Sequence, residues 1–205
     1  MSAIKNIIFD LGGVLLNIDY QKTTNAFKQL GYVDFESMYS MLKGNNVFDS
    51  LETGHISEEA FYRYMTGAAS VTVTNRQVQA AWNAMILDFR TESLGHLKIL
   101  REKYRVFLLS NTNSIHKKAF DLILNEQTGV AGLEHYFEKA YFSQQVGLRK
   151  PDSGIFEHVL QDAGIAATES LFIDDLPPNI ETADRLGFKT HLLQPHERIE
   201  HLTYY

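Results

Sequence analysis

Short apolar runs that are hydrophobic on both faces recur along this chain, and they constrain its fold more than any other feature. Runs of this length without alternation suit strands that are covered above and below. Amphipathic segments of helical length separate most of them, such as residues 153–163, which Gly164 ends with a left-handed stop. This alternation predicts an α/β fold with a doubly wound parallel sheet. The runs are residues 6–9, 105–109, 140–142, 170–173 and 190–193.

The region from Tyr20 to Asp88 interrupts the alternation. It consists of successive amphipathic helical patterns without a convincing buried strand, with Ser57 as one predicted N-cap and Thr74 as another, in a capping box. Residues 71–74 alternate like a strand, but four residues are few and we expect a loop. The sequence therefore predicts a core formed by residues 1–19 and 89–205, with residues 20–88 inserted as a small helical cap.

Composition excludes several classes of function. The net charge of −6 offers no basic excess for a nucleic acid, and no apolar stretch reaches the length of a membrane helix. There are no cysteines, which excludes disulfides, thiolate nucleophiles and thiolate metal sites. The N-terminal apolar run is too short for a signal peptide. We therefore expect a cytoplasmic protein that binds neither nucleic acid nor membrane.

Polar side chains follow the predicted strands at the points where the strands end. In an open parallel sheet, ligands bind beyond the carboxyl ends of the strands, where the strand order reverses. The side chains expected at this edge should therefore carry the chemistry. They are Asp10, Ser110 and Asn111, Asp174 and Asp175, and, ahead of a later helix, Lys150.

Asp10 is the candidate nucleophile. It directly follows a predicted buried strand and lies shortly before Gly12 and Gly13, so the backbone there can approach a ligand closely. A carboxylate can attack phosphorus and form an acyl phosphate, which divides one difficult displacement into two easier ones. The alternative is that Asp10 is an ordinary turn or cap residue.

Asp174 and Asp175 add two carboxylates to the same edge, and crowded carboxylates repel unless a cation or proton lies between them. Mg²⁺ suits such a site because it prefers oxygen ligands. We expect Asp10, Asp175 and the carbonyl of Gly12 to bind the metal, with Asp174 orienting a bound water. The alternative is that the Asp174–Asp175 pair caps the helix that opens near residues 177–179.

Phosphate recognition is expected from two further elements. Ser110 and the amide of Asn111 lie where a strand gives way to a helix, a position that favours anions. Lys150 would neutralise both the nucleophile and the transferring phosphoryl group. Each element is weak alone, since Ser and Asn commonly end strands and an isolated lysine is usually a solvated surface residue.

Together these elements resemble, in order and spacing, the four motifs of the haloacid dehalogenase-like hydrolases, and the likeness spans nearly the whole chain. Residues 51–58 also resemble the branch that contains the bacterial alpha-glucose-1-phosphate phosphatase and the N-terminal phosphatase domain of soluble epoxide hydrolase. The resemblance implies a Rossmann-like core, a small helical cap, Mg²⁺ and an aspartyl-phosphate intermediate. The residues that carry it are 9–15, 109–113, 149–151 and 172–175.

The chain departs from this pattern at one position. Phosphatases of the superfamily carry a second aspartate two residues after the nucleophile, which protonates the leaving group and then activates water; here that residue is Gly12. General acid–base help is worth about 10²–10⁴-fold. Asp19 and His55 are the substitute acids we consider. The alternatives are that Asp19 is a helix N-cap and that His55 is a polar turn residue.

Three functions follow as hypotheses. The first is a Mg²⁺-dependent phosphatase that acts on a small phosphorylated metabolite, such as a sugar phosphate. The second is a haloacid dehalogenase, in which Asp10 displaces halide from carbon. The third is a catalytically silent protein that binds phosphate but has lost turnover because Gly12 replaces the acid. The sequence leaves the substrate and the oligomeric state open.

Overall fold

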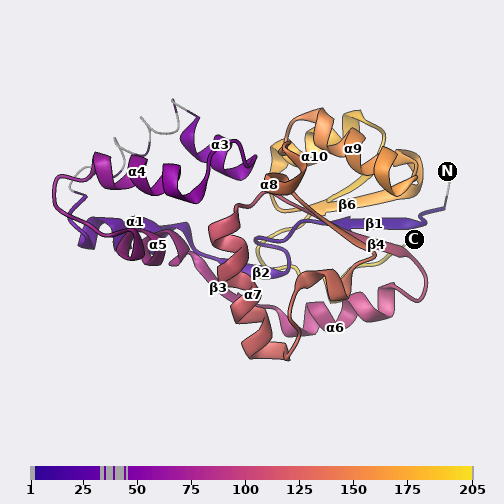
Figure 1. The fold of residues 1–205 in the computed structure, drawn as a ribbon. Helices are drawn as coiled ribbons and strands as arrows, with labels where there is room; N and C mark the ends of the chain where they lie inside the picture. Colours follow the sequence, from indigo (N-terminus) through magenta and orange to yellow (C-terminus); the bar gives the residue numbers. More distant parts are fainter. Residues whose placement is uncertain (1–2, 33–34, 36–38, 40–43, 45, 205) are drawn as a thin grey trace.

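A five-stranded parallel sheet forms the centre of the computed structural model, which describes residues 3–32, 35, 39, 44 and 46–204 (Figure 1). The strand order is β5-β4-β1-β6-β7. The predicted α/β Rossmann-like sheet is confirmed, and each of the five apolar runs forms a strand. The strands are β1 (Asn6–Phe9), β4 (Arg105–Ser110), β5 (Lys139–Phe142), β6 (Ser170–Asp174) and β7 (Lys189–Leu192).

Both faces of the sheet are covered by helices, which explains why its central strands, β1, β4 and β6, are mostly apolar on both faces. Ile7 and Phe9 of β1 belong to one hydrophobic cluster, whereas Ile8 between them belongs to another. The first cluster is completed by α6 (Thr91–Leu100) and α7 (Ser114–Thr128), and the second by α9 (Ser153–Ala163) and α10 (Pro177–Arg185). Figure 1 shows α9 and α10 on one side of the sheet and α6 on the other. Gly164 ends α9 with φ of 60°, as predicted.

The register of the strands determines where the carboxyl edge of the sheet, which carries the candidate site, lies. Phe9 of β1 pairs with Leu108 of β4 and with Ile173 of β6, so the three strands end at nearly the same level. From β1 the chain eventually joins β4 on one side, and from β6 it proceeds to β7 on the other. The strand order therefore reverses between β1 and β6, and a crevice opens at their carboxyl ends.

Within the described ranges, helices with their own hydrophobic cluster lie to one side of the sheet (Figure 1). They are α1 (Tyr20–Gln29), α3 (Val47–Glu52), α4 (Glu58–Ala68) and α5 (Asn75–Asn83). The predicted helix starts are confirmed: the Ser57 hydroxyl accepts from the Ala60 amide, and Thr74 forms a capping box with Gln77. None of the helices in the described ranges has the length and apolar character that a membrane crossing requires.

A second sheet joins these helices to the centre, and the sequence reading missed it. It is an antiparallel ribbon of β2 (Leu16–Ile18) and β3 (Ile86–Phe89). The region up to Asp88 therefore ends in strand residues, none of which is buried before Phe89. Only four residues long, β3 gains its hydrogen bonds from a partner about 70 positions away, so no local pattern marks it.

We propose the division into a core (residues 1–19 and 89–205) and a cap (residues 20–88), with β2 just before the first boundary and β3 across the second. Residues 1–2, 33–34, 36–38, 40–43, 45 and 205 of these ranges lie outside the described part of the chain.

The packing between β6 and α9 gives a stability prediction. Phe172 is fully buried, and its ring meets that of Phe156 edge to face at 5.2 Å between centroids. Phe172→Ala should lower the free energy of unfolding by about 3–5 kcal/mol, because it removes buried apolar surface and leaves a cavity. Leu122→Ala, at an exposed position of α7, should change it by less than about 0.5 kcal/mol. Urea denaturation measures both, and equal effects would contradict this account of the core.

Candidate active site

Three carboxylates converge where the strand order reverses. Asp10 follows β1, Asp174 ends β6 and Asp175 comes next, and one oxygen from each lies within 4.8 Å of the others. Gly13 makes this approach possible, since its φ is +74° and a Cβ there would lie 2.1 Å from Oδ2 of Asp175. Only glycine tolerates both conditions without displacing the carboxylate.

Lys150 connects two of these carboxylates. Its Nζ donates to Oδ1 of Asp10 and to Oδ2 of Asp174, each at 2.6 Å, and the residue is only 1% exposed. The side chain of Asn111 fixes the Lys150 backbone, because its Nδ2 donates to the Lys150 carbonyl at 2.8 Å and its Oδ1 accepts from the Lys150 amide at 2.9 Å. Lys150 is therefore a buried and fully positioned cation rather than a solvated surface residue.

Asp174 is surrounded by protein donors. Besides Lys150, its oxygens accept from the Leu176 amide at 2.8 Å and from Nδ2 of Asn179 at 3.0 Å. Asp174 therefore holds Lys150 and the backbone just before α10 in place. Its expected role in orienting a metal-bound water stays a prediction.

Burial and mutual repulsion govern the ionisation of this cluster. Desolvation, opposed by Lys150 and reinforced by Asp174 and Asp175, raises the pKa of Asp10 to about 7. Desolvation and the charge of Asp174 also raise the pKa of Asp175. Desolvation alone would lower the pKa of Lys150, but the charges of Asp10 and Asp174 raise it.

A divalent cation fits this donor set. Three carboxylates and one ammonium leave two negative charges, which one divalent ion would balance. Oxygen ligands at the edge of a sheet are those that Mg²⁺ prefers. Asp10 and Asp175 could hold it through their side chains and Gly12 through its carbonyl, since all three line the same cavity.

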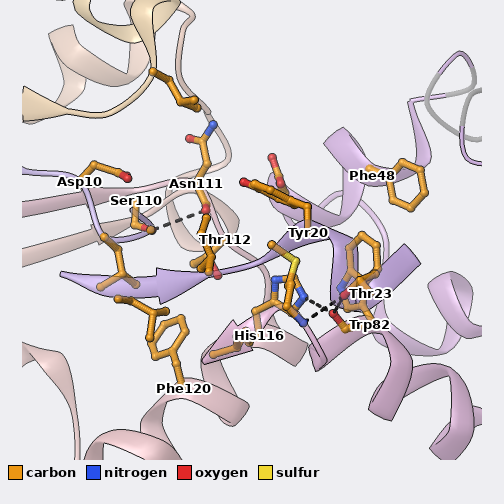
Figure 2. Close-up of a pocket in the computed structure, with 18 of the residues that line it drawn as sticks. Asp10, Tyr20, Thr23, Phe48, Trp82, Ser110, Asn111, Thr112, His116 and Phe120 are labelled. Atoms are coloured by element: carbon orange, nitrogen blue, oxygen red, sulfur yellow. Dashed lines mark hydrogen bonds between the residues drawn. The ribbon is translucent and has the colours of Figure 1, made fainter. Parts of the chain in front are cut away.

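A cavity of about 650 Å³ extends from the carboxylates to the cap helices (Figure 2). Figure 2 shows Asp10 and Ser110 at one end and Phe48 and Trp82 at the other. Ser110 ends β4, is 2% exposed and, with Asn111, lines the Asp10 end, where an anion was expected to bind. The cavity can enclose a small organic molecule with its polar group at the sheet edge.

The two candidate substitute acids are not brought to this cavity. Asp19 is the N-cap of α1, where its Oδ1 accepts from the Gln21 amide at 2.9 Å, and it is not among the described residues that line the cavity. His55 is exposed beyond α3, and its Nδ1 lies 2.7 Å from the Thr53 hydroxyl. The N-cap position of Asp19 is confirmed, a turn position accounts for His55, and neither is among the described lining residues of the cavity, so a substitute acid at either one stays a prediction.

Sequence reasoning missed one ionic contact at the site. Glu52 at the end of α3 accepts from Arg149 Nε at 3.0 Å and Nη2 at 2.9 Å, while Asp49 lies 3.0 Å from Nη1. Glu52 and Arg149 both line the cavity. Each occurs in a segment that carries the family resemblance, but nothing local indicates that residues 97 positions apart meet.

Comparisons with known proteins agree with this geometry. The family model of haloacid dehalogenase-like hydrolases matches residues 4–187. D-ribitol-5-phosphate phosphatase from Bacteroides thetaiotaomicron is 32% identical over 189 residues, which cover 91% of this chain and 90% of that protein. The crystal structure of a family enzyme from the same organism, in complex with magnesium and inorganic phosphate, superimposes with a TM-score of 0.86 at 37% identity, covering 97% of this chain and 98% of that one. A hydrolase from Porphyromonas gingivalis gives 0.83 at 36% identity, covering 96% and 94%.

The raised pKa of Asp10 predicts how stability depends on pH without metal. An acid whose pKa rises from 3.8 unfolded to about 7 folded keeps its proton longer in the native state, so its contribution to stability falls as pH rises from about 4 to 7. With EDTA present, the free energy of unfolding of the wild type should therefore fall between pH 5 and pH 8, and it should fall less for Asp10→Asn, because the amide has no proton to lose. Urea denaturation of both proteins at the two pH values measures this difference. An equal or larger fall for Asp10→Asn would contradict the raised pKa of Asp10.

Proposed function

The chain belongs to the haloacid dehalogenase-like hydrolases, and we propose that it is a Mg²⁺-dependent phosphatase that transfers the phosphoryl group of a small metabolite to Asp10. The observation that carries this proposal is the position of the Asp10 carboxylate. It lies at one end of a cavity, within 4.8 Å of two other carboxylates and 2.6 Å from a buried lysine. A carboxylate that attacks phosphorus must approach an anion, so it needs positive charge nearby, which the lysine supplies and which a divalent cation held by the carboxylates would add.

Mg²⁺ would be held by Asp10, Asp175 and the carbonyl of Gly12. When bound, it offsets the charge of the carboxylates and of the phosphoryl oxygens. The raised pKa values of Asp10 and Asp175 support this assignment, because a cation would favour the ionised forms that burial disfavours. The related enzyme crystallised with magnesium and inorganic phosphate supports it as well.

The chain's own residues would carry out two displacements. In the first, a carboxylate oxygen of Asp10 attacks phosphorus, the bond to the ester oxygen breaks, and the leaving alkoxide takes a proton from water. In the second, water attacks the aspartyl-phosphate and loses a proton to solvent, releasing phosphate and restoring the Asp10 carboxylate. Lys150 would stabilise charge in both steps, with Ser110 and the Asn111 amide binding phosphoryl oxygens.

The substrate would be a monophosphate that fits between the sheet edge and the cap. The relative that hydrolyses D-ribitol 5-phosphate makes polyol and sugar phosphates the first compounds to test. Because Gly12 provides no acid, substrates whose leaving group needs little protonation, such as sugar 1-phosphates and acyl phosphates, should be turned over fastest.

A metabolite panel assayed with Mg²⁺ tests this function. The wild type should release phosphate from at least one member, and Asp10→Asn should lower that rate by about 10³-fold or more, since it removes the nucleophile. Equal rates would remove Asp10 from this role. Chloride release from 2-chloropropionate without Mg²⁺ would favour a dehalogenase. Failure on acetyl phosphate together with retained beryllofluoride binding would favour a silent binding protein.

Gly12 offers a gain-of-function test. A Cβ added there would meet only the flexible Ile18 side chain, at 3.2 Å from Cδ1, and φ does not lie in the left-handed region. Gly12→Asp should therefore be accommodated and should speed hydrolysis of alkyl phosphates by about tenfold or more, with acetyl phosphate much less affected. Gly12→Asn, of nearly equal size, is the matched control and should give no gain. Equal rates for the Asp and Asn variants would show that proton transfer does not limit turnover.

A further inference from the structure

Cationic side chains line the cavity, but each of those described is already paired with carboxylates of the protein. Among its described lining residues the cationic side chains are Lys150 and Arg149. Lys150 contacts Asp10 and Asp174, and Arg149 contacts Glu52 and Asp49, all at 2.6–3.0 Å. The cation nearer the cap is therefore outnumbered by its own carboxylate partners. A second anionic group on a substrate would meet negative charge there rather than a free positive charge.

His116 does not supply the missing positive charge. Its Nε2 lies 3.2 Å from the Trp82 carbonyl, and its Nδ1 lies 3.2 Å from Nδ2 of Asn113, so both ring nitrogens are engaged within the protein. Burial lowers the pKa of His116 to about 4, which keeps the ring neutral near pH 7. The His116 ring stacks on Trp82 at 5.1 Å between centroids and forms part of an uncharged wall.

That wall continues towards the cap. The Trp82 ring stacks on Phe48 at 5.3 Å, and Phe48 stacks on Tyr39 at 4.5 Å, and all three line the cavity. Figure 2 shows Phe48, Trp82 and His116 across the cavity from Asp10. Tyr20 also lines the cavity, and its hydroxyl stays protonated because desolvation and nearby carboxylates raise its pKa to about 12. The aromatic part of the surface opposite the phosphate end is therefore uncharged, and among the described lining residues the only charges on that surface come from the Glu52–Arg149 pair.

We infer that this site selects phosphate monoesters whose organic part is uncharged and rejects those that carry a second anionic group, with the Glu52–Arg149 ion pair as the determinant of this selectivity. The inference rests on the proposed phosphatase function. Carboxylate pairing occupies the donors of Arg149 that would otherwise bind a substrate carboxylate in a bidentate manner. An anion placed beside Glu52 would lose its hydration without gaining a partner.

Two pairs of compounds test the selectivity. D-ribitol 5-phosphate and 5-phospho-D-ribonate share a carbon skeleton and differ in one terminal group, a hydroxymethyl in the first and a carboxylate in the second. Phenyl phosphate and 4-carboxyphenyl phosphate differ by one added carboxylate. In each pair of which the enzyme hydrolyses at least one compound, the compound without the carboxylate should have the higher kcat/KM, by about tenfold or more. Equal values within a pair would overturn the inference while leaving the phosphatase function intact. Release from no phosphate ester at all would overturn the function itself.

A variant pair tests the role assigned to Glu52. Glu52→Gln removes the charge that neutralises Arg149, so the neutral-to-anionic ratio of kcat/KM should fall by about fivefold or more. Asp49→Asn should lower the ratio in the same direction. The matched control is Glu58→Gln, which breaks a comparable 2.7 Å ion pair to Lys118 away from the cavity and should leave the ratio unchanged. If Glu52→Gln and Asp49→Asn both fold, by circular dichroism, and keep the wild-type ratio, the determinant lies elsewhere.

Discussion

The arrangement of this molecule depends on one buried ammonium group between two carboxylates. Lys150 can remain charged in the interior only because Asp10 and Asp174 accept from it, and those carboxylates can remain buried only because Lys150 is there. The three residues come from segments far apart in the sequence. Their meeting requires β1 and β6 to be neighbours in register and the loop before α9 to reach across them. The strand order of the sheet is therefore what brings the charged residues of the site together.

Local chemistry was sufficient to predict much of this arrangement. Apolar runs without alternation marked the five parallel strands, because both faces of the sheet are covered. Ser57, Thr74 and Gly164 marked helix ends through contacts made within a few residues. The positions of Asp10 and Asp175 followed from a general property of parallel sheets, namely that polar residues after the strands gather at one edge. Most of the fold and the acidic centre of the site were therefore readable from short segments.

The features that the sequence did not reveal depend on distant partners. The β2–β3 ribbon exists because two weak segments supply each other's hydrogen bonds. The role of Asp174 became visible only when Lys150 and Asn179 were placed around it. Asp19 and His55 were reasonable substitute acids by chain position, yet capping and turn contacts hold them away from the cavity. The Glu52–Arg149 contact likewise depends on how the cap helices lie over the sheet.

The ribbon has a structural consequence for how such a chain can diversify. Ile18 and Ile86 are register partners, so the polypeptide departs from and returns to the same point. The segment between them therefore begins and ends at one place in the structure. Such a segment can gain, lose or exchange residues while the positions of its two ends are kept. Changes in this segment, which carries Glu52, can therefore alter the cavity wall while its two points of attachment stay together.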